Sequence, residues 1–129
     1  MENWKKFILV LTIFLFVIFL DLFLYFKTDK LIFETQNLLS TVKESLDSED
    51  FEDGKKNIKK LQNNWEKNNK ILSFFIEHDE LEKVSTKVEV IKENATNGEY
   101  ENALEDIVEA KYILEHIKDK YNFSLKNIF

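Results

Sequence analysis

The residues best equipped for chemistry are two histidines, His78 and His116, and each directly follows a glutamate. In an up-and-down helical bundle both Glu-His pairs would lie at the same end of the molecule, where the two imidazoles could approach each other. With a carboxylate from Asp79 or Glu80, they could bind a divalent cation such as zinc. The alternative is that His78 caps or terminates a helix and that His116 lies at the edge of the core. We expect no cofactor and retain the two histidines only as candidate metal ligands.

Most other catalytic sites are excluded by the composition of the chain. Its 129 residues include no Cys, no Pro and two Gly, so thiolate metal sites, cysteine nucleophiles, phosphate-binding loops and nucleophile elbows are all missing. A di-iron bundle site would place a glutamate three residues before each histidine, where this chain has Phe75 and Ile113. No nucleophile, base and orienting group can be assembled from the remaining residues. We therefore expect a protein that is not an enzyme.

An apolar run from Phe7 to Phe26 decides where the candidate site residues lie relative to a membrane. Only Thr12 and Asp21 are clearly polar in it, and twenty helical residues span about 30 Å of hydrocarbon. A cleavable signal would have a shorter apolar core followed by small residues, whereas the first alanine of this chain is Ala95. The run is typical of an uncleaved signal anchor in the cell membrane.

The charges around the apolar run indicate its direction. Lys5 and Lys6 precede it in a short head, and positively charged flanks favour the cytoplasmic side. We therefore expect residues 1–6 in the cytoplasm, residues 7–26 across the membrane and residues 27–129 outside. Lys27 and Lys30 follow the run, which leaves the reverse orientation open.

Apolar residues recur at helical spacing along the rest of the chain. The membrane helix should continue outward to about residue 47. A second helix should follow an Asp47-Ser48 cap and run from about Glu49 to Glu77, with a break at 78–80. A third should stop at Asn97-Gly98. A fourth should run to Tyr121, followed by a short tail in which Ser124 could cap a final turn. The predicted fold is all-α: one N-terminal transmembrane helix followed by an extracytoplasmic up-and-down bundle of three to four helices. Its expected core includes Leu31, Leu38, Val42, Leu46, Phe51, Ile58, Leu61, Trp65, Leu72, Phe75, Leu81, Val84, Val88, Ile91, Ala95, Tyr100, Ala103, Leu104, Ile107, Leu114, Ile117 and Tyr121.

Charge is distributed unevenly over the part of the chain expected outside. From residue 28 onward there are 15 lysines against 22 acidic residues, which argues against a nucleic-acid partner. Residues 55–70 hold six lysines and one glutamate, whereas residues 99–109 hold five acids and no lysine. In a three-helix bundle the two runs would be neighbours and would pair across the helices at small gain. Alternatively, the basic run is a patch for an anionic polymer or a partner.

Three segments carry a resemblance that covers nearly the whole chain. They are residues 65–82 with the Ile-Glu-His-Asp-Glu-Leu sequence at 76–81, Leu-Glu-His-Ile at 114–117, and Leu-Lys-Asn-Ile-Phe at 125–129. The chain resembles an uncharacterised domain-of-unknown-function family of small single-span membrane proteins from low-GC Gram-positive bacteria. The resemblance implies an uncleaved anchor, an outer helical domain and a multi-spanning membrane partner, and it implies no activity.

Two places in the sequence suggest contacts with a membrane or a partner. Asp21 lies within the apolar run, where it could pair with a polar group on a partner's membrane helix or reach the headgroups by snorkelling. The outward part of the first helix should climb about 30 Å and the second helix should return about 43 Å, so its end should reach the membrane surface. We therefore expect an apolar cluster there that includes Phe74, Phe75, Ile76 and Phe129.

Two functions remain open at this point. The first is a non-enzymatic, membrane-anchored accessory or scaffold protein that contacts another membrane protein. The alternative is an extracytoplasmic ligand-sensing helical bundle that signals through a partner, because the short cytoplasmic head cannot hold an output domain of its own.

Overall fold

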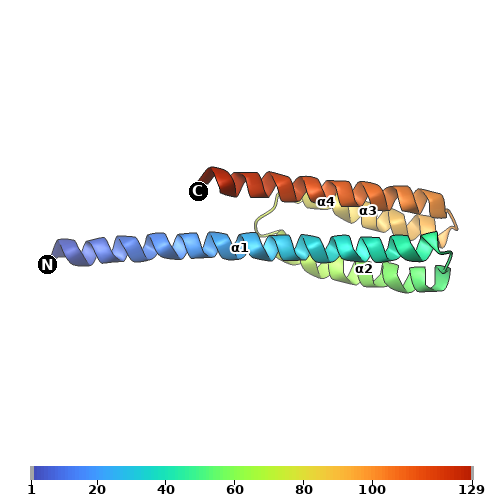
Figure 1. Cartoon of the computed structure of the whole chain (residues 1–129), viewed down its shortest axis with the longest axis horizontal. Coiled ribbons are helices and arrows are strands. Elements are labelled where there is room, and N and C mark those ends of the chain that lie inside the picture. The colour runs from blue at the N-terminus through green and yellow to red at the C-terminus, as the bar shows by residue number, and fades with distance from the viewer. Residues whose placement is uncertain (1, 129) are drawn as a thin grey trace.

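Four helices account for nearly all of the chain. The computed structural model describes residues 2–128, and side chains up to Tyr121. The helices are α1 (Glu2–Asp47), α2 (Phe51–Leu72), α3 (His78–Thr96) and α4 (Tyr100–Ile128), and residues 2–128 contain no strand. They run up and down beside one another (Figure 1). The prediction of an all-α bundle is confirmed.

Helix α1 has two different halves. Its apolar N-terminal half projects from the bundle, while its C-terminal half packs as the fourth helix (Figure 1). No Pro or Gly interrupts its 46 residues, so nothing in the backbone breaks it. The described packing pairs are α1 with α2, α2 with α3, α3 with α4, and α4 with α1. Helices α2 and α4 therefore occupy opposite corners of the bundle.

The inward face of α1 follows a regular alternation of three- and four-residue steps, which we call the inner seam. Its members from residue 32 onward are buried in the core, and its earlier members are half-buried. The same spacing runs through both halves of the helix, as expected for a helix that packs into a bundle. The inner seam consists of Ile18, Asp21, Tyr25, Thr28, Ile32, Thr35, Leu39, Val42 and Leu46.

The turns explain where the sequence interpretation of the helix ends was right and where it was wrong. The backbone of Glu49 has a positive φ of 59°, and Asp50 caps α2 by accepting a hydrogen bond from the Asp53 amide at 3.2 Å. The predicted cap at Asp47-Ser48 is therefore wrong. The stop at Asn97 and Gly98 is confirmed, because Asn97 is the C-cap of α3 and Gly98 has a φ of 75°.

Two further helix ends differ from the prediction. Helix α2 ends at Leu72 rather than near residue 77, so it is about 33 Å long and not 43 Å. Residues 78–80 form the first turn of α3 rather than a break, and Asp79 and Glu80 suit the positive N-terminal end of that helix. Ser124 lies inside α4, which continues to Ile128 without a separate final turn.

The core is apolar, with a few polar groups whose hydrogen bonds join α1 to α2. The buried Asn57 side chain donates to the Ser45 hydroxyl at 2.8 Å and to the Asp53 carboxylate at 3.2 Å. Nearer to the C-terminal end of α2, the side-chain amide of Asn68 donates to the backbone oxygen of Leu31 at 3.5 Å. These bonds fix the relative height of the two helices.

Candidate functional site

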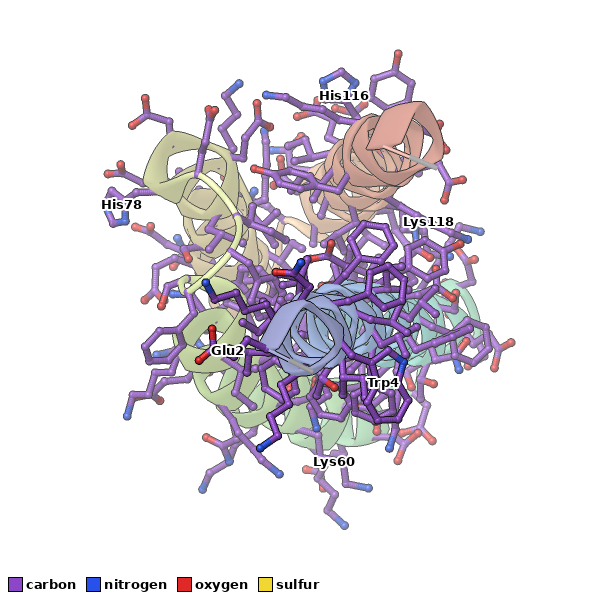
Figure 2. The ribbon with its side chains drawn as sticks, turned by 90° about the vertical axis from the view of Figure 1, so that its left-hand side faces the viewer. Glu2, Trp4, Lys60, His78, His116 and Lys118 are labelled. Atoms are coloured by element: carbon purple, nitrogen blue, oxygen red, sulfur yellow. The ribbon has the colours of Figure 1, made fainter. Side chains whose placement is uncertain are left out.

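The two histidines do not form a metal centre with each other. His78 and His116 project from α3 and α4 in different directions (Figure 2). His78 Nε2 lies 3.8 Å from Glu82 Oε2, and both side chains are largely exposed. Residues 2–121 contain no group of three potential ligands close enough to hold a metal ion. The structure therefore does not bring the candidate ligands together, and the alternative of a helix-capping His78 needs correction too, because His78 begins α3.

The residues predicted to form a membrane-side apolar cluster divide into three environments. Phe74 is 87% exposed in the turn between α2 and α3. Phe75 is partly buried against the core. Ile76 is 4% exposed and belongs to the core, so its assignment to a contact surface has to be corrected. Phe129 lies outside the described residues.

The α2–α3 turn is held by α4 through contacts that the sequence interpretation missed. The Glu77 amide donates to the Tyr121 hydroxyl at 2.9 Å. Lys120 Nζ lies 3.8 Å from Glu77 Oε2 and 3.5 Å from Glu80 Oε1. These contacts position the backbone that presents Phe74. The only sequence signal for them is the basic end of α4 opposite the acidic start of α3.

Asp21 lies on the inner seam. It is closer to the N-terminus of α1 than the level at which α2 ends and α3 begins. Within residues 2–23, only Ile18 and Asp21 are partly buried. Lys118 Nζ lies 3.6 Å from Asp29 Oδ1, and the ten further residues of α4 extend about 15 Å toward the N-terminal half of α1. The end of α4 thus lies beside the apolar half of α1 (Figure 1).

Helices α2 and α3 do not reach Asp21. Asn68 sits at the height of Leu31, and α2 ends one turn later at Leu72. At the height of Asp21 the bundle is therefore reduced to α1 and α4, and the two corners below α2 and α3 are open (Figure 1). No described side chain forms a hydrogen bond or ion pair with the Asp21 carboxylate, whereas the Thr12 hydroxyl donates to the Ile8 backbone oxygen at 2.8 Å.

The acidic run of α4 pairs with α3, not with α2. Lys87 of α3 pairs with Asp106 at 3.7 Å and also with Glu109, and Asn94 donates to Asp106 at 2.6 Å. The predicted pairing between residues 55–70 and residues 99–109 is therefore wrong. Its premise was a three-helix bundle, but α1 supplies a fourth helix and separates α2 from α4.

The Lys87 contacts change the titration of this amine. The hydrogen bond to Glu109 raises the pKa of Lys87, the charges of Glu109 and Asp106 act in the same direction, and desolvation opposes them. A pKa raised on folding means that the charged form stabilises the folded state. That contribution is complete below the unfolded pKa and disappears as the pH rises through the higher folded pKa.

Replacing Lys87 with Met should lower the free energy of unfolding at pH 7 by about 1 kcal/mol, because a partly exposed charged hydrogen bond is lost. The difference from the parent protein should stay constant up to about pH 10 and shrink above it. Urea unfolding at several pH values measures this. Lys83→Met serves as the control, because Lys83 is exposed and forms no described ion pair. A difference that grows above pH 10 would contradict the assignment.

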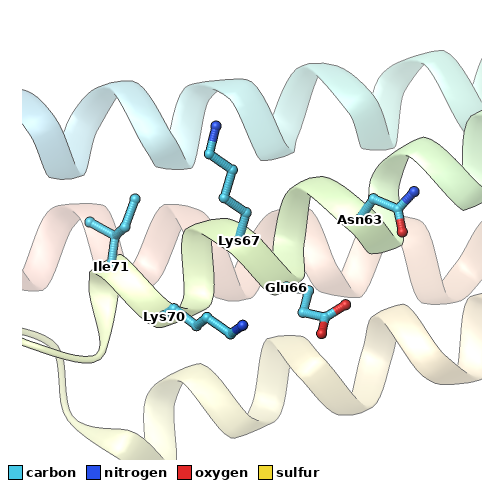
Figure 3. A pocket seen from close by; sticks show the side chains of 5 residues that line it. All are labelled: Asn63, Glu66, Lys67, Lys70 and Ile71. Atoms are coloured by element: carbon cyan, nitrogen blue, oxygen red, sulfur yellow. The ribbon is translucent and has the colours of Figure 1, made fainter.

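The lysines of α2 are exposed and form no ion pair within the part of the chain that the structure describes. Lys60 points outward on the side of the bundle away from α4 (Figure 2). Near the C-terminal end of α2, a surface hollow of about 390 Å³ is lined by side chains of this helix alone (Figure 3). They are Asn63, Glu66, Lys67, Lys70 and Ile71.

Among residues 2–128, α1 is the one helix long and apolar enough to cross a membrane, a criterion that core helices and signal sequences also meet. No curated protein and no solved structure matches the chain. Residues 22–128 match the model of a family described as "Domain of unknown function (DUF4363)". The match leaves out only the first 21 residues and the last one, so the chain belongs to this uncharacterised family.

Proposed function

We propose that the protein is a non-enzymatic, membrane-anchored accessory or scaffold subunit that contacts another membrane protein. The observation that carries the proposal is that the inner seam continues into the N-terminal half of α1, beyond the point that α2 and α3 reach. There the seam includes Asp21, a carboxylate within an apolar segment, with no described partner. A charge at such depth is costly and marks a functional contact.

The geometry favours membrane helices as the partner. Ile18, Asp21 and Tyr25 extend the face that packs the bundle into a region where two helix positions are open. Helices of a multi-spanning membrane protein fit these positions, because they would continue the bundle and offer a polar group to Asp21. We place residues 1–6 in the cytoplasm and the bundle outside a bacterial cell membrane, in keeping with Lys5 and Lys6.

The α2–α3 turn supplies a second contact at the membrane boundary. Phe74 is exposed close to the height at which the apolar run of α1 ends. Large exposed aromatic side chains favour the headgroup region or a protein interface. Phe74 would therefore rest on the lipid surface or on the partner, while Phe75 and Ile76 hold the turn from within.

Replacing Asp21 with Leu should abolish recovery of the partner when the tagged full-length chain is purified in mild detergent. The reason is that the buried polar contact between the two proteins is lost. Thr12→Leu is the matched control, because it also removes a polar group from the apolar run. The Thr12 hydroxyl already donates a hydrogen bond to the backbone oxygen of Ile8 and needs no partner protein. Recovery should be quantified by mass spectrometry against membrane insertion. Equal recovery with Asp21→Leu and normal insertion would overturn the proposal.

The continuity of α1 favours one alternative, an extracytoplasmic ligand-sensing bundle that signals through a partner. Because the same helix packs in the core and enters the apolar run, a ligand that tilts the bundle would move the membrane segment. A small molecule that raises the melting temperature of the full-length chain would favour this alternative.

A further inference from the structure

A groove between α2 and α3 concentrates positive charge in a protein that is acidic as a whole. Its volume is about 320 Å³. Lys55 and Lys59 line it from α2 and Lys92 lines it from α3, and no acidic residue does so. Ile58 and Ala95, both buried, form its apolar base. The net charge of the chain is −6, so the charge of this groove is opposite in sign to that of the whole chain.

The side-chain amines of these three lysines form no ion pair or hydrogen bond with a described residue. On the other helices, Lys43, Lys87, Lys118 and Lys120 lie beside carboxylates, whereas no lysine of α2 has a described ion pair. Lys55 and Lys59 are four residues apart on one helix, a spacing at which like charges repel. The folded chain therefore places these three lysines around one groove without a described carboxylate partner, and a bound anion would relieve the repulsion.

We propose that the α2–α3 groove binds a polyanion that carries successive phosphate groups. Lysine ammonium groups bind phosphate as point charges, and two lysines about 6 Å apart along α2 with a third across the groove can contact more than one phosphate at once. The Gln62 side chain lies in the same lining and donates to no described residue. The groove lies in the half of the bundle away from the apolar run, near the start of α2 and the end of α3.

The site is independent of Asp21 and of the proposed membrane partner. The two lie toward opposite ends of the bundle, and no residue belongs to both. A loss of partner recovery in Asp21→Leu and a loss of phosphate binding in a groove variant are therefore separate outcomes. Failure of one leaves the other standing.

The test uses the full-length chain in nonionic detergent and a groove variant with Lys55→Gln, Lys59→Gln and Lys92→Gln. Its matched control carries Lys56→Gln, Lys60→Gln and Lys83→Gln, which removes the same charge from exposed lysines outside the groove. All six positions are exposed, so the fold should persist, and circular dichroism checks this. The probes are inorganic polyphosphate, a polyol phosphodiester polymer, orthophosphate and polyglutamate, titrated by isothermal calorimetry.

Polyphosphate or the phosphodiester polymer should bind more tightly than polyglutamate. The groove variant should weaken that binding at least about tenfold and should reduce the dependence of affinity on salt, because fewer phosphates are neutralised. The control should retain most of the affinity. Whichever phosphate polymer binds more tightly identifies the source of the phosphates. Equal weakening in the two variants, equal binding of polyglutamate, or no binding of either phosphate polymer would overturn the proposal.

Discussion

Replacing Lys30 with proline should lower the free energy of unfolding of the full-length chain by about 3 kcal/mol or more. Lys30 is exposed on α1 between the apolar run and the buried part of the helix. Proline there removes a helical hydrogen bond, and its ring clashes with the carbonyl four residues earlier. The inner seam on the N-terminal side of residue 30 would no longer be continuous with the inner seam on its C-terminal side. Urea unfolding in nonionic detergent, followed by circular dichroism, measures the loss.

Lys30→Ala provides the control for this substitution. It removes the same exposed side chain but keeps the backbone amide, so it should change stability by no more than about 0.5 kcal/mol. If proline costs no more than alanine, the apolar run and the bundle are joined by a flexible stretch rather than by one helix.

Replacing Leu39 with alanine should lower the free energy of unfolding by about 2 to 5 kcal/mol. Leu39 is fully buried on the inner seam, so truncation removes apolar contacts and leaves a cavity. Phe33, on the same helix, is 61% exposed. Phe33→Ala should therefore have a much smaller effect in the same denaturant titration. A loss below about 0.5 kcal/mol for Leu39→Ala would mean that α1 is not part of the core.

The helices themselves could be predicted from the sequence where an apolar stripe meets a clear end signal. In α3 all five predicted core residues are buried, and the helix stops at the predicted asparagine and glycine. The end of α2 could not be found in this way. Residues 71–76 are apolar on more than one face, so periodicity does not show that the backbone turns after Leu72 or that Ile76 folds back into the core.

The candidate sites depended on information that spacing alone does not contain. Sequence order predicted that His78 and His116 lie at the same end of the bundle. It did not predict the direction in which each side chain points. Whether α1 joins the bundle decides which charged faces meet, and with four helices the acidic run of α4 meets Lys87 instead of α2. Asp21, by contrast, stood out from the sequence, because a carboxylate within an apolar run is rare.

Helix α1 continues without a break from the apolar run into the bundle. Phe19 and Asn37 are both exposed on α1, and their separation of 18 residues corresponds to five helical turns, so they share a face. The chain has no native Cys, so Phe19→Cys and Asn37→Cys can be spin-labelled selectively and measured in bilayers by double electron–electron resonance. An unbroken helix predicts one narrow distance distribution centred near about 27 Å. A broad distribution, or one centred at a clearly shorter distance, would contradict a continuous α1.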